Sequence, residues 1–184
     1  MNNAQTETAR ITALKRYDIL DTPADGTFDR MTALAAKVFN MPIVIISLVD
    51  TDRIWFKSHY GVEVQQIDRV PGLCSSAVLS HELYIVEDAR QDPRALANPL
   101  VVGELGLGFY AAAPLTTHDG HNLGTFCIID QKPRYLTDAQ KLMLQDMAAI
   151  VMDEIELRLA VRTAIGENAQ RTAELRKFRE AVAS

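Results

Sequence analysis

Cysteine is scarce in this chain, because Cys74 and Cys127 are the only two among its 184 residues and lie far apart in the sequence. A disulfide framework or a structural zinc site needs a second pair of ligands at closer spacing. Neither can be the basis of this fold. We therefore expect both thiols to be reduced.

The chain also lacks an excess of basic residues and lacks long apolar runs. It has 19 Lys and Arg against 24 Asp and Glu, a formal charge of −5, whereas a nucleic-acid surface needs clustered cations to displace counterions from phosphates. No window approaches the ~20 apolar residues of a membrane span, and the polar start MNNAQTETAR has no apolar leader core. We expect no nucleic-acid partner, no membrane span within this segment and a cytoplasmic location.

The clearest folding signal runs from Pro42 to Gly61. Ile43 to Val49 is rich in β-branched residues, which predicts a strand buried on both faces. Asp50 to Asp52 supplies turn chemistry, and Arg53 to Tyr60 predicts a partner strand at or near a sheet edge. Alternation along that second strand places three side chains on one side: Ile54, Phe56 and Ser58.

Helical periodicity marks both ends of the chain. Residues 6–20 predict an amphipathic helix that Asp21 ends, and Thr27 is the expected cap of a second helix. The second helix should turn an apolar face to the sheet, formed by Phe28, Met31, Leu34, Ala35, Val38 and Phe39. Asp138 begins a long helix whose apolar stripe is Leu142, Leu144, Met147, Ile150, Val151, Ile155, Leu159 and Val161. Residues 163–184 are charged and predict a connecting helix that Gly166 weakens.

The middle of the chain combines a weakly periodic segment with a hairpin. Residues 62–108 should contain a short helix at 74–79 and a short strand at 83–86, and a loop region this long is expected to roof any binding cavity. Phe109–Thr116 and Leu123–Asp130 predict a hairpin with Asp119 and Gly120 at its tip. The element order is α+β, an antiparallel sheet with helices on one face and irregular cover on the other.

Two short motifs could suggest ligand chemistry but have simpler interpretations. His118 and His121 have a spacing that could hold a metal, but without a third ligand an exposed hairpin tip explains them. Gly103, Gly106 and Gly108 resemble a phosphate-binding loop only loosely, because no helix begins directly after them. Loop flexibility is the better interpretation.

The two thiols and three aspartates leave alternatives open. Cys74 could be a nucleophile or an attachment point, or a buried structural thiol. Cys127 fits the core of a strand, and a redox pair with Cys74 requires Cα atoms within ~7 Å. Asp50, Asp88 and Asp130 each follow an apolar run. They could pair for acid–base work, but aspartates that end strands by bonding nearby backbone are commoner.

Several stretches, in this order, resemble the GAF family of small-molecule sensor domains, in particular those at the N-terminus of bacterial signalling proteins. The stretches are ALKRYDILDTPADGTFDRMTALAA, PIVIISLVDTDRIWFKSHYG, RVPGLCSSAV, IVEDARQDPRALANPLV, GFYAAAPLTTHDGHNLGTFCIID and PRYLTDAQ. The resemblance covers about Ile11 to Leu159.

The resemblance implies a GAF sensory domain at 1–162 and a signalling helix at 163–184. It implies a pocket between one sheet face and residues 62–108, terminal helices that form a homodimer, and no catalysis in this segment. The tail ELRKFREAVAS looks like the lead-in to a PAS domain, followed by a histidine kinase or a cyclic di-GMP enzyme such as a diguanylate cyclase. The candidate pocket residues are Phe56, Cys74, Ser75, Ser76, Asp88, Asn98, Tyr110, Ala112, Thr125 and Cys127.

Departures from the family pattern bear on the ligand, which stays unknown. Ser76 occupies the place of a histidine that accompanies the cysteine in many relatives, so a covalent bilin or haem is not expected. Gly108 stands where relatives often carry an arginine before FYA. The three-cysteine arrangement of the methionine sulfoxide reductase branch is missing. A thiol-dependent small-molecule reductase using Cys74 is the rival hypothesis, and a dimerisation module without ligand is the third.

Overall fold

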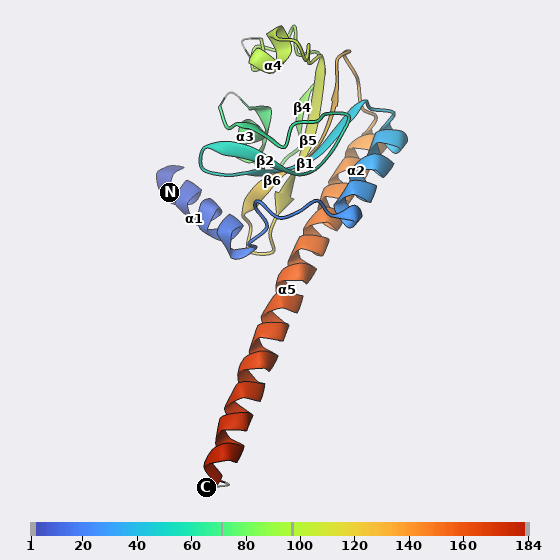
Figure 1. The fold of residues 1–184 in the computed structure, drawn as a ribbon. Helices are drawn as coiled ribbons and strands as arrows, with labels where there is room; N and C mark the ends of the chain where they lie inside the picture. The colour runs from blue at the N-terminus through green and yellow to red at the C-terminus, as the bar shows by residue number, and fades with distance from the viewer. Residues whose placement is uncertain (1–2, 71, 97, 183–184) are drawn as a thin grey trace. The chain divides into compact units, whose positions relative to one another are not determined.

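The computed structural model describes residues 3–70, 72–96 and 98–182. An antiparallel six-stranded sheet forms the centre of the domain, with the strands in the order β3-β2-β1-β6-β5-β4 (Figure 1). The strands are β1 Ile43–Val49, β2 Arg53–Tyr60, β3 Gln66–Asp68, β4 Tyr84–Val86, β5 Phe109–Thr116 and β6 Asn122–Asp130. The helices are α1 Asn3–Arg16, α2 Gly26–Phe39, α3 Leu73–Ala77, α4 Pro99–Val102 and α5 Asp138–Val182. The predicted α+β class is confirmed.

Strand β1 is buried along its whole length, between β2 and β6, as its nearly unbroken apolar run predicted. A β-bulge interrupts its pairing with β2, because Ile46 pairs with Ser58 but Ser47 pairs with Phe56. Lys57 is the extra residue of this bulge. The short strand β3, which the sequence did not predict, forms the sheet edge beside β2.

The bulge overturns the predicted side of Ser58. Its hydroxyl lies 3.0 Å from the Thr32 hydroxyl of α2 and donates to Asp29 Oδ1, whereas Phe56 belongs to the apolar cluster on the opposite face. An extra residue shifts the alternation of side chains by one place. Lys57 is held by Thr22 Oγ1 at 2.8 Å and the Pro23 carbonyl at 2.9 Å, which fixes the segment between α1 and α2.

Helix α2 differs from its prediction in its cap and in its buried face. Asp25 is the cap rather than Thr27, because Asp25 Oδ1 accepts a hydrogen bond from the Thr27 N–H. Leu34 and Val38 are exposed, contrary to the predicted face. The buried residues are Phe28, Thr32, Ala35, Ala36 and Phe39. The buried face of α2 is therefore rotated from the predicted one. Thr32 can be buried on it because its hydroxyl is hydrogen-bonded to the Ser58 hydroxyl.

Helix α1 ends at Arg16, four residues before the predicted end at residue 20. Asp18 and Asp21 have positive φ values of 45° and 58°, a backbone conformation that does not continue a right-handed helix. Leu14 and Tyr17 are buried, which fits the amphipathic character predicted for this segment.

Helix α5 belongs to two compact units, 1–152 and 153–184, and the predicted boundary at 162 falls inside this one continuous helix. In the first unit Leu142 and Ile150 are exposed, contrary to the predicted stripe, while Leu144, Ala148, Val151 and Met152 are buried. The predicted connecting helix is helical through Gly166 as far as Val182, and residues 183–184 lie outside the described part. Within the described residues, no helix is both long and apolar enough to cross a membrane.

The two faces of the sheet have different cover. Helix α2 packs on β1 and β2, while α3 and α4 lie on the other side (Figure 1). Helix α3 begins at Leu73, one residue before the predicted start, and ends at Ala77, two residues before the predicted end, and β4 occupies the last three predicted positions of its strand. The predicted hairpin tip is confirmed, with Gly120 at a φ of 82°. Pro114 lies beyond Ala112, the last residue of β5 that pairs with β4.

Candidate ligand cavity

A cavity of about 390 Å³ lies between the sheet face turned away from α2 and the irregular cover of residues 62–107. This volume lies within the range of sites that hold small molecules. The lining is almost entirely apolar and consists of Ile43, Ile45, Phe56, Val62, Glu63, Val64, Ile67, Leu73, Cys74, Leu100, Leu105, Leu107, Tyr110, Cys127 and Ile129.

The alternation of side chains along the strands builds the cavity floor. Ile43 pairs with Ile129 and Ile45 pairs with Cys127, so four neighbouring side chains of β1 and β6 project to the same face. Tyr110 pairs with Ile129 from β5 and extends this floor. The cavity position of these residues therefore follows from strand register.

The cavity reaches solvent beside Glu63 and Val64, which are both exposed. Glu63 is the one side chain with a formal charge among the described lining residues, and it stands at this opening. No cation among them could hold an anionic ligand inside. The arrangement suits the apolar body of an uncharged molecule.

Two thiols and a phenol form the polar part of the cavity. Tyr110 Oη donates a hydrogen bond to Cys74 Sγ at 3.1 Å, and Cys127 lines the same cavity. Behind them, the Ser47 and Thr125 hydroxyls lie 2.9 Å apart. Hydrogen bonding from Cys127 lowers the pKa of Cys74 although burial opposes this, and the same interaction together with burial raises the pKa of Cys127. Burial raises the pKa of Tyr110.

Of the ten predicted pocket residues, Phe56, Cys74, Tyr110 and Cys127 line this cavity. Ser75 donates to the Arg69 carbonyl at 2.7 Å, and Ser76 is exposed. The short helix α3 turns both serines away from the cavity because consecutive helical residues point in different directions.

The other four predicted residues have structural positions. Asp88 Oδ1 accepts from the Arg90 N–H, and the Asn98 side chain caps α4 by accepting from the Leu100 N–H. Ala112 is buried in the apolar cluster beside the cavity without lining it. Thr125 bonds Ser47 within the sheet.

The missed lining residues fall into two classes. Ile43, Ile45 and Ile129 could have been found from strand alternation, which places them on the same face as Cys127. Leu100 lies on the four-residue helix α4 and Leu105 in a turn, and both segments are too short for a periodic signal to indicate direction.

The remaining predicted motifs do not add a second site. Asp50 accepts from the Thr51 N–H at 2.8 Å, and Asp130 accepts from the Lys132 N–H at 3.1 Å, which fits the interpretation of strand-ending aspartates. In the described parts of the chain, no three His, Cys, Asp or Glu residues are grouped to hold a metal, and this applies to the His118–His121 tip. A Cβ on Gly108 would lie 2.3 Å from the Gln131 carbonyl oxygen, so close approach rather than flexibility requires glycine there.

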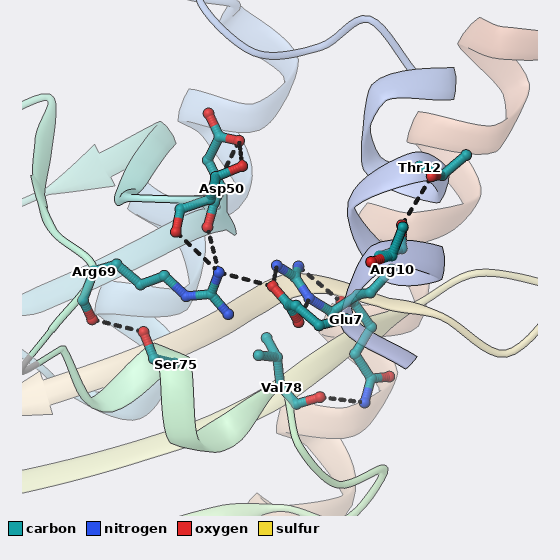
Figure 2. A network of polar contacts seen from close by, with 10 residues as sticks. Glu7, Arg10, Thr12, Asp50, Arg69, Ser75 and Val78 are labelled. Carbon is teal, nitrogen blue, oxygen red and sulfur yellow. Dashed lines mark hydrogen bonds and ion pairs between the residues drawn. The ribbon is translucent and has the colours of Figure 1, made fainter. Parts of the chain in front are cut away.

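A polar network ties the segment before α3 to α1 (Figure 2). Glu7 forms ion pairs with Arg10 at 2.9 Å and with Arg69 at 2.7 Å. Arg69 also donates to the Asp50 carbonyl at 2.9 Å, and its own carbonyl accepts from Ser75 of α3. Hydrogen bonding from Arg10 lowers the pKa of Glu7 to about 2. The roof of the cavity is therefore linked to the N-terminal helix.

Comparison with known proteins decides the family of this fold. The family model of the GAF domain matches residues 23–155. The chain belongs to the GAF domain family. Its resemblance to GAF sensors and its GAF-like sheet are thereby confirmed.

Individual relatives give the context of this GAF domain. It is 38% identical over 152 residues to cyclic di-GMP phosphodiesterase PA2567 of Pseudomonas aeruginosa, a match over 82% of this chain and 26% of that protein. Among solved structures, it is similar to the GAF domain of Acinetobacter phosphoenolpyruvate-protein phosphotransferase, with a TM-score of 0.63, 18% identity and coverage of 88% and 98%. It is also similar to free methionine-R-sulfoxide reductase from Neisseria meningitidis, with a TM-score of 0.62, 16% identity and coverage of 88% and 96%. At these identities the two structures establish the shared fold alone.

Proposed function

We propose that this GAF domain is a cytoplasmic sensory and regulatory module, not itself catalytic, whose cavity binds a small, uncharged and largely apolar molecule. The apolar cavity of about 390 Å³ is the observation that carries this proposal. Its lining offers hydrophobic area for affinity, and Tyr110 with the two thiols offers a few neutral polar groups for orientation.

Helix α5 is the proposed route from this module to an output domain. Within 153–182 its exposed face has a seven-residue repeat, with Val161, Asn168, Leu175 and Val182 at one position. A second position of the repeat is occupied by Leu157, Ala164, Arg171 and Phe178. Spacings of three and four between the two positions are those of the a and d seam of a coiled coil. Gly166 lies away from this seam, where its missing side chain matters least.

We propose a parallel homodimer along that seam. Asn168 would meet Asn168 of the second copy, and a buried asparagine at one a position favours a defined register of two helices. At the flanking positions, Asp153 would face Arg158 of the second copy, and Glu174 would face Arg179. Glu154 at the first a position and Arg171 at a d position are the charged departures from an apolar seam. The charge pattern therefore supports a second copy as the partner.

The proposed output is an enzyme of cyclic di-GMP turnover. The 38% identity to a protein named as a cyclic di-GMP phosphodiesterase supports this class of output over a histidine kinase. The match spans 26% of that relative, so the named activity is not assigned to the matched region.

The cavity proposal can be tested with the uncharged fluorophore N-phenylnaphthylamine. We expect a saturable rise in fluorescence with the wild-type chain. The variant Ile129→Phe should fill the cavity and weaken this binding at least about tenfold, because a buried lining residue gains volume inside the site. The matched control is Leu79→Phe, which adds a ring at an exposed position. Equal binding by wild type and Ile129→Phe would contradict the proposal, and native mass spectrometry after gentle purification would identify a co-purified ligand.

The dimer proposal can be tested by sedimentation velocity. We expect a concentration-dependent dimer that Leu175→Glu converts to a monomer, since two like charges would meet at the seam. Lys177→Glu lies outside the seam and is the control. A wild-type monomer at high concentration would contradict the homodimer.

The rival function is a thiol-dependent reductase, which the position of Cys74 in the cavity favours. Repeated turnover of methionine sulfoxide with a dithiol reductant, lost in Cys74→Ser, would establish it. We expect no turnover.

A further inference from the structure

The thiol pair on the cavity wall has chemistry that simple binding of an apolar molecule leaves unused. We propose that Cys74 and Cys127 form a redox-active dithiol, which an organic hydroperoxide entering the cavity converts to a disulfide. This inference rests on the proposed function in one respect, because the oxidant must enter the same apolar cavity.

The geometry places both thiols on the wall of one cavity although the residues are 53 positions apart in the sequence. Both thiols line the cavity, and helix α3, which carries Cys74, packs against β6, which carries Cys127. Cys127 is fixed in β6, where it pairs with Ala112 and with Ile45. Cys74 lies on α3, a helix of five residues flanked by irregular segments. A short helix of this kind can move toward β6, as a bond of ~2.05 Å between the two sulfur atoms requires.

The cavity selects the oxidant by its polarity. Cys74 and Cys127 are both buried, so a reagent reaches them through space lined by Ile43, Ile45 and Leu107. A hydroperoxide with a hydrocarbon body matches that lining better than a strongly hydrated molecule does. No charged side chain of the described lining lies at the thiols, since Glu63 stands at the opening.

The reaction proceeds in two balanced steps. Cys74 Sγ attacks the terminal peroxide oxygen, the O–O bond breaks, an S–O bond forms, and the thiol proton passes to the departing alkoxide. The peroxide is thereby reduced to an alcohol, and Cys74 becomes a sulfenic acid. Cys127 Sγ then attacks that sulfur, an S–S bond forms, and hydroxide leaves with the Cys127 proton as water. The Tyr110 hydroxyl donates to Cys74 Sγ and so stabilises its thiolate, which is the reactive form.

The disulfide would join the roof of the cavity to its floor. Ser75 follows Cys74 on α3 and bonds Arg69, which in turn pairs with Glu7 of α1 (Figure 2). Movement of α3 toward β6 therefore acts on the polar network at the N-terminal helix.

The test is oxidation of the reduced, intact chain with cumene hydroperoxide, followed by intact mass and peptide mapping without reductant. We expect loss of two hydrogen atoms and a linked pair of peptides that contain Cys74 and Cys127. Cys127→Ser should lose the link and stop at an oxidised Cys74, whereas Cys74→Ser should leave Cys127 reduced. Two free thiols in the treated wild type, or a doubly oxidised Cys74 beside a free Cys127, would overturn the inference.

Further measurements separate this inference from the proposed function. Circular dichroism melting of both cysteine variants, with Cys74→Ala as a second substitution, checks that they fold. N-phenylnaphthylamine binding without disulfide formation would overturn the dithiol and leave the binding function standing. Disulfide formation without fluorophore binding would overturn the binding function and leave the dithiol standing. Oxidation of Ile129→Phe should be at least tenfold slower than that of the wild type, and an unchanged rate would refute entry through the cavity.

Discussion

The two faces of the central sheet are made from the same kinds of residue but have different roles. Ile46 pairs with Ser58, whose hydroxyl meets Thr32, so Ile46 lies under α2 and is fully buried. Its neighbour Ile45 points to the opposite face and lines the cavity. One strand therefore supplies both a fully packed layer and the floor of an open space.

Stability and ligand binding depend on different faces of the sheet in this domain. A side chain surrounded by packed atoms gains dispersion contacts on all sides, whereas one beside a void loses the contacts on that side. The face under α2 can therefore supply more stability per residue, and the cavity face can keep space for a ligand. The cavity is compatible with a stable fold because packing on the other face does not depend on it.

The largest expected effect is the loss of unfolding free energy in Ile46→Ala, compared with that in Ile45→Ala by chemical denaturation. Ile46→Ala should lower the free energy of unfolding by about 4 kcal/mol, because it creates a new cavity in a packed layer. Ile45→Ala should cost about 2 kcal/mol, because it enlarges a space that already exists. The two variants share the strand and the residue change, so the face of the sheet is the variable that differs.

Fluorophore binding is a second measurement that distinguishes the two faces of the sheet. Ile45→Ala should change the affinity for N-phenylnaphthylamine, whereas Ile46→Ala should leave it unchanged under conditions where the variant is folded. Equal losses of stability in both variants, with equal effects on binding, would show that stability and binding are not assigned to separate faces of the sheet.

The sequence predicted most of the fold because its strands carry strong local signals. The β-branched run of β1 and the Asp119–Gly120 tip each specify their structure without distant partners. The features that the sequence predicted wrongly depend on tertiary contacts. The bulge at Lys57 arises from its contacts with Thr22 and Pro23, and the rotation of α2 depends on the bond between Thr32 and Ser58. Local patterns carry no information about such pairs.

The site was predicted less completely for the same reason. Cys127, Tyr110 and Phe56 lie on regular strands, where alternation fixes direction. Ser75 and Ser76 were expected beside Cys74 because they are its neighbours in sequence, but the turn of α3 points them elsewhere. The presence of Cys74 and Cys127 in one cavity depends on tertiary structure, since it brings a short helix to a strand that is distant in the sequence.

The smallest expected effect concerns Glu7, which links the cavity roof to α1. Its folded-state pKa of about 2 lies below the ordinary value of 4.5, so its stabilising contribution is present above pH 4.5 and is lost as the pH falls toward 2. Glu7→Gln should cost about 1 kcal/mol at pH 7, after discounting for a side chain that is 34% exposed.

Urea denaturation at pH 7 and at pH 3 tests both the size and the sign of this contribution. The difference in the free energy of unfolding between wild type and Glu7→Gln should be smaller at pH 3. At that pH the Glu7 carboxylate takes up a proton when the chain unfolds, so its advantage over the amide shrinks. Glu82→Gln removes an exposed carboxylate and serves as the control, with an expected change near zero at both values. A gap that widens on acidification would contradict the ion pairs of Glu7 with Arg10 and Arg69. In that case, the segment before α3 would be held by the hydrogen bond from the Arg69 side chain to the Asp50 carbonyl instead.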